Sequence, residues 1–592
     1  MLEALYKYAI EHDLTAKPGF KYKNVKYYIS FSATGEYIGL EKVEDGTPQP
    51  LCPDIGTLAN GKTKSNIIVE KAEVIFNLPE KNKKGELEFK REQKQKFYLD
   101  ALNEAGEYDS YFKTAANGLI QNMESISSEF MQIKKAKGSD FIGIKVNDSP
   151  LESRTEYLEW WEDFRKGLDT KKRSGNARCF ITGDIADPVK TVPVVQGLLS
   201  VGGHTKGDSF ICFDKDCYQS YGFKQAANAS VSEEAVTAVN AALAELIKKA
   251  PKPVAGAKNI HWFSEETEND VTVLPDFGFG GDDLNDDKNE KLLEDEQRVQ
   301  KMFSALKNNT LPVMPQNRYF MMSLSGVNGR VMIRSYDEGT YDDLCNNLRL
   351  WYSDLAICKP SYGYSYPKLY GIYTRLINYN TDPKKLTEKI DKELSGISPG
   401  IVYSIYHGTP LPDTVAVKAL AYIRSQMYGD NDDSKKKSAP IPDLTACQIL
   451  KAWLNRKYRN QNKEESLIMD KLNVDSPSVA YQTGRLMAVY ALIQNAALGD
   501  VGAGVVERYY TSACSSPALV MGKLATMSQY HLSKLKSDKP GMYTNYNKLL
   551  EEITVKIGTS LPKTFTLEQQ SEFALGYYFQ RSQRFTKKET EE

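Results

Sequence analysis

The sequence predicts an α+β fold in which a β-containing N-terminal and middle region precedes an all-α C-terminal helical bundle. Alternating apolar and polar residues, typical of strands, recur in the first two thirds of the chain. From about Met469 onward, apolar residues recur instead at steps of three and four, and Gly, Pro or Ser-Asp-Lys-Pro separates the segments. Four such helices could close a core by themselves, so this tail is predicted to fold as a bundle of its own.

A chain of 592 residues is too long for one hydrophobic core, so several domains are expected. Shifts in pattern place the boundaries. The predicted parts are an N-terminal α+β domain (1–150), a β-rich middle region with a glycine loop (151–275), an acidic linker (276–300), a strand hairpin followed by helices (301–468), and the C-terminal bundle (469–592).

Composition narrows the class of protein. The net charge of -1 gives no general attraction to nucleic acid, so any site for a polyanion must be a local patch. The 8 Cys form no dense framework, which favours a reducing compartment. The first residues carry acidic groups where a secretion signal would be apolar, and no run of 18 apolar residues occurs. A soluble, cytoplasmic protein without membrane contact is expected.

The N-terminal domain is predicted to open with a short amphipathic helix over residues 2–10. Residues 25–32 and 36–43 alternate around a Gly-containing turn and predict a β-hairpin. Residues 67–78 alternate in the same way and predict another strand. A helix ending near Leu102, a helix over 108–133, a strand over 141–146 and a helix around Trp160 complete this part.

In the middle region, two short β-type runs, 179–182 and 209–213, flank the glycine loop 202–207. Ser230 and Glu233 have the spacing of a capping box and predict the start of a helix. A strand is predicted at 259–266, a hairpin from 318–324 and 329–336, and a helix over 340–355.

One short motif matches the phosphate-binding P-loop: Gly56-x4-Gly61-Lys62-Thr63. A P-loop requires a buried strand before the glycines and a helix after them. Three prolines precede this motif and a strand-like run follows it, so a short basic polar loop is the better interpretation.

No catalytic or metal site is predicted, and no cofactor. Cys179, His204, Cys212 and Cys217 fall in one segment and could surround zinc, but the spacing lacks a second knuckle, and small buried thiols are the favoured interpretation. The 5 His lie in no recognisable hydrolytic motif.

Candidate contacts to nucleic acid are therefore local, and each keeps an alternative interpretation as solvated surface or packing residues. The loop 61–66 combines two lysines with Thr, Ser and Asn. The glycine loop offers His204 and Lys206. In the C-terminal bundle a shallow positive surface is predicted from Arg485, Arg508, His531, Lys534, Lys536, Arg581 and Arg584, near Tyr509, Tyr510, Tyr577 and Tyr578.

Several motifs, taken in order, resemble the large subunit of the type I-C CRISPR Cascade surveillance complex. They are CFITGD from Cys179, GGHTKGDSFICFDKDCYQSYGFKQAANASVSEEA from Gly202, the 317–336 hairpin, RYYTSACSSPALVMGKL from Arg508 and FALGYYFQR from Phe573. The resemblance runs from the first helix to the C-terminus. It implies a noncatalytic subunit of an RNA-guided complex, in which base pairing reads most of the target and protein reads a short adjacent motif.

The resemblance also implies partners: the guide crRNA, target double-stranded DNA, the Cascade backbone and handle-processing subunits, and a helicase-nuclease. A small subunit would be made from the chain's own C-terminal region, with Met469 as the candidate internal start. The motif-reading loop is predicted to comprise Lys62, Thr63, Lys64, Ser65 and Asn66, supported by His204, Lys206, Gln225 and Asn228. The displaced DNA strand would contact Arg485, Arg508, His531, Lys534, Arg581 and Arg584.

Two other classes stay open at this point. One is an enzyme, either a P-loop ATPase or a metal-dependent nuclease acting on nucleic acid. The other is a pure protein scaffold, which would not bind duplex DNA at any salt concentration.

Overall fold

The computed structural model describes residues 1–14, 19–44, 46–81, 86–168, 177–186, 188–189, 191–265, 317–359, 363–428, 440–499 and 504–582. The chain divides into two compact units. We call Leu2–Val194 with Ser209–Ala244 the N-terminal unit, and Val195–Asp208 with Glu245–Glu592 the C-terminal unit. The predicted acidic linker, 276–300, lies outside the described residues.

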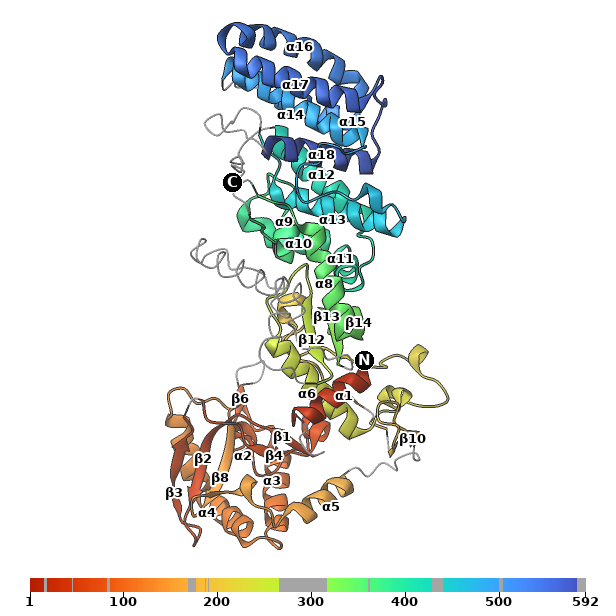
Figure 1. Cartoon of the computed structure of the whole chain (residues 1–592). Coiled ribbons are helices and arrows are strands. Elements are labelled where there is room, and N and C mark those ends of the chain that lie inside the picture. The colour runs from red at the N-terminus through yellow and green to blue at the C-terminus, as the bar shows by residue number, and fades with distance from the viewer. Residues whose placement is uncertain are drawn as a thin grey trace, which may run out of the picture. The chain divides into compact units, whose positions relative to one another are not determined.

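The N-terminal unit is built on a small mixed sheet with the strand order β3-β2-β8-β5 (Figure 1). β2 (Val25–Phe31) pairs antiparallel with β3 (Tyr37–Lys42), as the hairpin prediction required. β2 also pairs in parallel with β8 (Phe141–Val146), which pairs antiparallel with β5 (Glu70–Lys71) and with β9 (Ser149–Pro150). Apolar side chains of β2 and β8, such as Ile29 and Ile144, are fully buried.

Helices cover this sheet. α4 (Ser110–Gln132) begins at Asp109, whose carboxylate accepts a hydrogen bond from the Tyr111 N–H, a typical N-cap. Gly118 of α4 lies against Phe31, where a Cβ would approach the ring to 2.7 Å. The other helices of this part are α1 (Leu2–Glu11), α2 (Ala72–Ile75), α3 (Glu92–Ala105) and α5 (Leu158–Leu168).

Three predictions in this unit need correction. Residues 67–78 are not one strand, because only Glu70–Lys71 pair and the chain turns at once into α2. Neither 179–182 nor 209–213 forms a strand, because β10 ends at Arg178 and a turn follows it. α6 (Glu233–Lys249) begins later than Ser230, which is left-handed at φ 45°, and Ser232 instead accepts the Ala235 N–H.

Short strands and 3-10 turns complete the N-terminal unit, and a further 3-10 turn, η3 (Leu199–Val201), belongs to the C-terminal unit. The strands are β1 (Phe20–Tyr22), β4 (Leu51–Pro53), β6 (Glu80–Lys81), β7 (Leu87–Glu88), β10 (Ala177–Arg178) and β11 (Ile185–Ala186). The 3-10 turns of the N-terminal unit include η1 (Gly56–Asn60), η4 (Asp216–Tyr218) and η5 (Gln225–Ala229).

The C-terminal unit joins one antiparallel sheet to a long series of helices. β12 (Lys258–Phe263), β13 (Arg318–Val327) and β14 (Arg330–Thr340) pair in that order, so the predicted strand and hairpin are confirmed. The helices that follow the sheet are α8 (Tyr341–Leu355), α9 (Leu369–Thr374), α10 (Leu386–Leu394), α11 (Ser398–His407), α12 (Asp413–Tyr428) and α13 (Leu444–Asn460).

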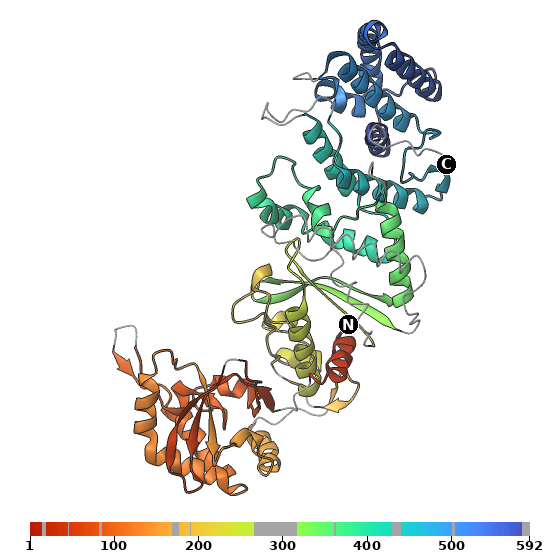
Figure 2. The ribbon, with the colours of Figure 1, turned by 60° about the vertical axis from the view of Figure 1, so that its left-hand side comes forward.

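The region after Met469 contains helices and loops but no strand among its described residues (Figure 2). It comprises α14 (Val479–Leu498), α15 (Val505–Ser515), α16 (Pro517–Asp538), α17 (Pro540–Ile557) and α18 (Leu567–Ser582). The prediction of four helices missed the break at Ser516, where Pro517 starts a new helix at its first turn. With the strands concentrated in the first two thirds, the predicted fold class is confirmed.

The helices after Met469 share one continuous core with those before it. Val254, Trp453 of α13 and Phe579 of α18 belong to the same buried cluster. Tyr458 of α13 donates to Glu572 of α18 at 2.6 Å, and Tyr577 donates to the Pro440 carbonyl at 3.0 Å. Whether this region folds alone stays a prediction, but its hydrophobic core continues into the helices that precede Met469.

Candidate nucleic-acid interface

The loop 61–66 of the N-terminal unit has a two-residue exposed tip on an anchored base. Lys62 and Thr63 are exposed. Lys64 reaches back to donate from Nζ to the Leu168 carbonyl at 2.7 Å, which fixes the chain directly behind the tip. Of the predicted reading loop, Lys62 and Thr63 therefore face solvent in a position to meet a ligand.

Ser65 and Asn66, the last two residues of the predicted reading loop, do not face solvent. Both are buried, and Ser65 Oγ donates to the Lys94 carbonyl at 3.1 Å. Asn66 Oδ1 accepts the Ile55 N–H at 3.0 Å, and its own N–H donates to Glu70 at 2.7 Å. The prediction that these two side chains read a ligand is wrong for this conformation, because their polar atoms already stabilise the loop. Sequence spacing could not distinguish an anchor from a tip.

The geometry around the P-loop motif lacks the features of a phosphate cradle. The segment before it is the short β4, which pairs only with β1, and Gly56–Asn60 form a 3-10 turn. The N–H of Gly61 donates to the Leu58 carbonyl at 3.3 Å, and no helix begins until Ala72. A helix N-terminus therefore does not face the lysine of this motif.

The glycine loop 202–207 belongs to the C-terminal unit. Gly202 has φ 84° and Gly207 φ 95°, left-handed values that favour glycine. The buried Asp208 carboxylate accepts the His204 N–H at 3.1 Å, and His204 Nδ1 accepts the Lys206 N–H at 3.1 Å. His204, Thr205 and Lys206 are thus held on a fixed, exposed turn, and the DNA contact predicted for His204 and Lys206 stays a prediction.

Gln225 and Asn228 of the N-terminal unit have different roles. Gln225 is exposed at φ 53°. Asn228 is half-buried, and its amide makes three hydrogen bonds to backbone atoms between Ser220 and Gln225. Asn228 therefore shapes its own loop, and the prediction that it supports direct DNA contact needs that correction.

The cysteines show one buried, electrostatically unusual thiol. Burial alone would raise the pKa of Cys179, but backbone N–H groups of Ser232, Thr182 and Ile181 point at the sulfur and lower its pKa to about 7. Cys212 and Cys217 are exposed, so the expectation of a core-facing Cys212 is wrong. Among the described residues, no three His, Cys, Asp or Glu side chains group as metal ligands would.

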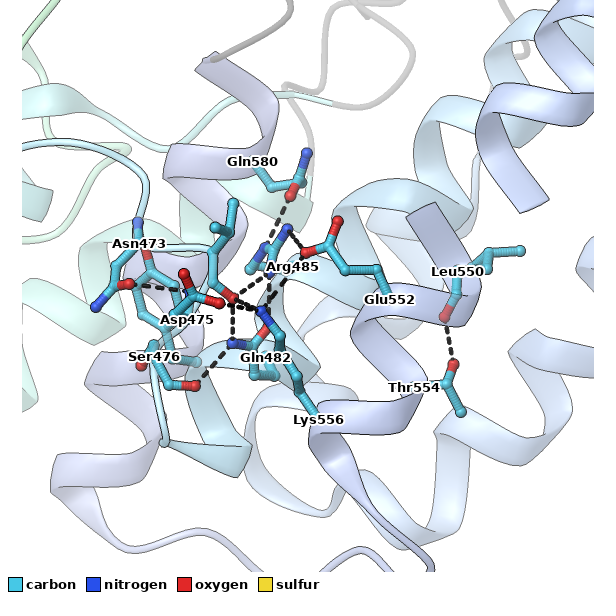
Figure 3. Close-up of polar contacts among 12 residues, drawn as sticks. Asn473, Asp475, Ser476, Gln482, Arg485, Leu550, Glu552, Thr554, Lys556 and Gln580 are labelled. Atoms are coloured by element: carbon cyan, nitrogen blue, oxygen red, sulfur yellow. Dashed lines mark hydrogen bonds and ion pairs between the residues drawn. The ribbon is translucent and has the colours of Figure 1, made fainter. Parts of the chain in front are cut away.

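In the C-terminal bundle, Arg485 of α14 is buried and lies between three elements (Figure 3). Its guanidinium donates to Gln580 Oε1 at 2.9 Å, to the Val474 carbonyl at 3.1 Å and to Gln482 Oε1 at 2.8 Å. It also pairs with Glu552 of α17 at 3.0 Å. The prediction that Arg485 forms part of a DNA-binding surface is wrong, because every face of the group is occupied within the protein.

The other predicted contacts to a displaced strand divide by exposure. Arg508 and Lys534 are exposed. Burial, and then the neighbouring Lys534, lower the pKa of His531, which disfavours a positive charge on this ring. Arg581, Tyr577 and Tyr578 are buried in α18, and Tyr510 is buried in α15. Arg584 lies outside the described residues.

Sequence reasoning predicted Lys534 of α16 as a contact but missed the rest of the outward stripe to which it belongs. Lys523, Tyr530 and Lys534 recur at seven- and four-residue spacing, which places them on one side of a helix, and all three are exposed. Lys523 Nζ lies 5.2 Å from the ring centre of Tyr509, a cation–π contact. The signal was available in the spacing, but it required knowing which face of α16 points outward.

The comparison with known protein families decides the identity of the chain. Residues 2–585 match the family described as CRISPR-associated protein (Cas_Csd1). The chain belongs to the Csd1 family of CRISPR-associated proteins. None of the curated proteins compared with the sequence matches it. Csd1 membership makes the chain a Cascade large subunit, as the resemblance implied.

The exposed candidate contact residues described above form three sets. The first is the tip Lys62 and Thr63, and the second is the glycine turn with His204 and Lys206. The third is the α16 stripe with Arg508. None of the described helices is both long and apolar enough to cross a membrane.

Proposed function

We propose that this chain is the noncatalytic large subunit of a type I-C Cascade. In this role it recognises the protospacer-adjacent motif in duplex DNA, contacts the 5′ handle of the guide RNA, and stabilises the displaced strand until a helicase-nuclease is recruited. The observation that carries the proposal is the family match along nearly the whole chain. The exposed cations on anchored turns supply the groups that such contacts require.

The motif-reading role is assigned to the loop tip. Lys62 is a flexible cation and Thr63 a short hydroxyl, able to contact phosphates or base edges. The base of the loop is rigid, because Lys64, Ser65 and Asn66 hold it through hydrogen bonds to the rest of the unit. Because the base is rigid, Lys62 and Thr63 keep a fixed position relative to each other and to a ligand.

The test uses the assembled complex with Lys62→Ala and, separately, Thr63→Ala, and a duplex carrying or lacking the adjacent motif. A phosphate contact should weaken binding to both duplexes equally and lower the salt slope by about 0.9 per contact. A base-edge contact should relax the motif preference by about 1–3 kcal/mol. Lys42→Ala, an exposed lysine on β3, is the matched control. Unchanged affinity, preference and salt slope in both variants would remove this loop from the proposal.

A second product is proposed to start at Met469 and to act as the small subunit. Such a product would lack α12 and α13, and with them Tyr458, which donates to Glu572, and Arg424, which donates to Gln570. The face of α18 that carries Glu572 and Gln570 would then be uncovered and would need a new partner. Expression of the natural gene should give a C-terminal fragment by mass spectrometry, and Met469→Leu should abolish it. A gene that yields only the full chain contradicts this part.

A further inference from the structure

A tyrosine at the tip of a strained turn is the strongest feature that the proposed function does not use. In the N-terminal unit, the Phe223 N–H donates to the Ser220 carbonyl at 3.0 Å and closes a four-residue turn. Its two central residues both have left-handed backbones, with φ 52° at Tyr221 and 77° at Gly222. This is the pattern of a type I′ turn, whose first central position favours Gly, Asn or Asp over a bulky residue.

Packing within the unit does not compensate for this strain. The Tyr221 side chain is 98% exposed, so its ring gains almost nothing from neighbouring atoms. A bulky residue in the left-handed region is unusual, and persistent strain of this kind is found where a backbone is held for function. The position calls for glycine, yet it holds a large aromatic ring that faces solvent.

The side-chain amide of Asn228 holds the turn in place. Asn228 Oδ1 accepts the Ser220 N–H at 2.9 Å. Its Nδ2 donates to the Phe223 carbonyl at 3.1 Å and to the Gln225 carbonyl at 2.8 Å. One amide therefore fixes both ends of the turn, and the ring projects from a backbone with little freedom to move.

The surroundings of Tyr221 are aromatic without net charge. Tyr218 is 46% exposed and Phe223 41%. Lys215 and Lys224 are balanced by Asp214 and Asp216 in the same loop. Such a surface would gain little from phosphates, but its rings suit the flat face of an unpaired base, since stacking tolerates every base and needs no charge.

We propose that Tyr221 stacks on an unpaired nucleobase and that Asn228 is its positioning residue. The inference rests on the proposed function, because it requires a chain that works on nucleic acid. It adds a contact to bases at a place distinct from the loop 61–66. The ring, open on both faces, supplies the contact area, and the rigid turn lowers the entropy lost on binding.

The test is the affinity of the full chain for labelled dT12, for rU12 and for an abasic DNA backbone of the same length. Tyr221→Ala should weaken binding to dT12, rU12 or both by about 5- to 150-fold, the range that stacking on one ring is worth. Binding to the abasic strand and the salt slope should not change. Tyr221→Phe and Tyr221→Trp should keep the affinity, and Tyr428→Ala, which removes another highly exposed tyrosine, should have no effect.

Two further variants separate stacking from folding. Tyr221→Gly should lose base binding but keep or raise Tm, because glycine relieves the strain. Asn228→Ala should lose base binding although it touches no ligand. Equal losses on base-bearing and abasic strands, or no loss at all, would overturn the inference and leave the proposed function standing. A wild-type chain that binds none of the three strands would overturn both.

Discussion

In the helices after Met469, glycine and arginine each occur in two opposite environments, closely packed in some positions and open to solvent in others. α14 and α18, the central pair, cross so closely that a Cβ at Gly484 would lie 2.0 Å from the Phe573 carbonyl oxygen, and one at Gly576 would lie 2.1 Å from that of Tyr481. On the outer helix α16, a Cβ at Gly522 would meet nothing within 4 Å. Arginine follows the same division, since Arg485 is buried and Arg508 exposed. A residue's role here depends on the helix face, which composition does not reveal.

The largest effect should come from the helix crossing. Gly484→Ala or Gly576→Ala forces two backbones apart and should cost at least about 4 kcal/mol of unfolding free energy, an unusually large loss for one methyl group. Gly522→Ala, in a mid-helix position with free space, should instead stabilise by about 0.5–1 kcal/mol. Urea unfolding followed by circular dichroism measures both. Similar, small changes in all three variants would show that the central pair is not close-packed.

The next effect concerns the buried arginine. Arg485→Ala leaves Gln580 Oε1 and Gln482 Oε1 without their donor, while the Val474 carbonyl keeps hydrogen bonds from Gln482 and Lys556, and should cost about 3 kcal/mol. Arg508→Ala removes an exposed cation and should change stability by less than about 0.5 kcal/mol. The same unfolding measurement applies. If Arg508→Ala proved the more destabilising of the two, the division between central and outer helices would be wrong.

The order of the elements was accessible from sequence because strand alternation and helical periodicity are local signals. The 25–31/37–42 hairpin, β12 to β14 and most helices were predicted correctly. The strand predicted over 67–78 failed because Glu70 and Lys71 alone find a partner in β8, and α2 follows at once. Pairing with a distant strand is a tertiary property, which alternation alone cannot show.

The candidate site was less predictable, because polar residues look alike whether they bind a ligand or the protein itself. Ser65, Asn66 and Arg485 were grouped with exposed neighbours on spacing alone, yet tertiary partners bury all three. Tyr221 was passed over, because the left-handed backbone that makes it unusual is visible only in three dimensions. The family resemblance, by contrast, rested on whole motifs in order and was confirmed.

A smaller, pH-dependent effect tests the joint between the central pair and α13. Glu572 of α18 accepts hydrogen bonds from Tyr458 and from Ser478, the N-cap of α14, both at 2.6 Å. Burial raises its pKa above the ordinary 4.5. The group therefore stabilises the fold fully below pH 4.5, and this contribution is lost as pH rises through the raised value.

Glu572→Gln mimics the protonated acid and should change stability by about 1 kcal/mol through the altered hydrogen bonds. The Tm of the wild type minus that of the variant should fall as pH rises from 4 to 8. Glu568→Gln, which alters a partly exposed carboxylate on the same helix whose pKa is lowered by Lys457, should give a difference that rises over the low-pH end of that range. A pH-independent difference for Glu572→Gln would show that this carboxyl does not titrate above its ordinary range.

The smallest effect on stability, and the clearest on binding, is expected at the outer face. Lys523→Ala combined with Lys534→Ala removes two exposed cations of the α16 stripe and should lower Tm only slightly, through the lost contact of Lys523 with Tyr509. If these lysines contact the displaced strand, affinity for single-stranded DNA should fall, and the salt slope should decrease by about 0.7 per lost phosphate contact, or about 1.4 in all. Lys463→Ala with Lys471→Ala, two exposed lysines between α13 and α14, is the charge-matched control. Equal losses in both double variants would mean that net charge, rather than the outer face of α16, attracts the strand.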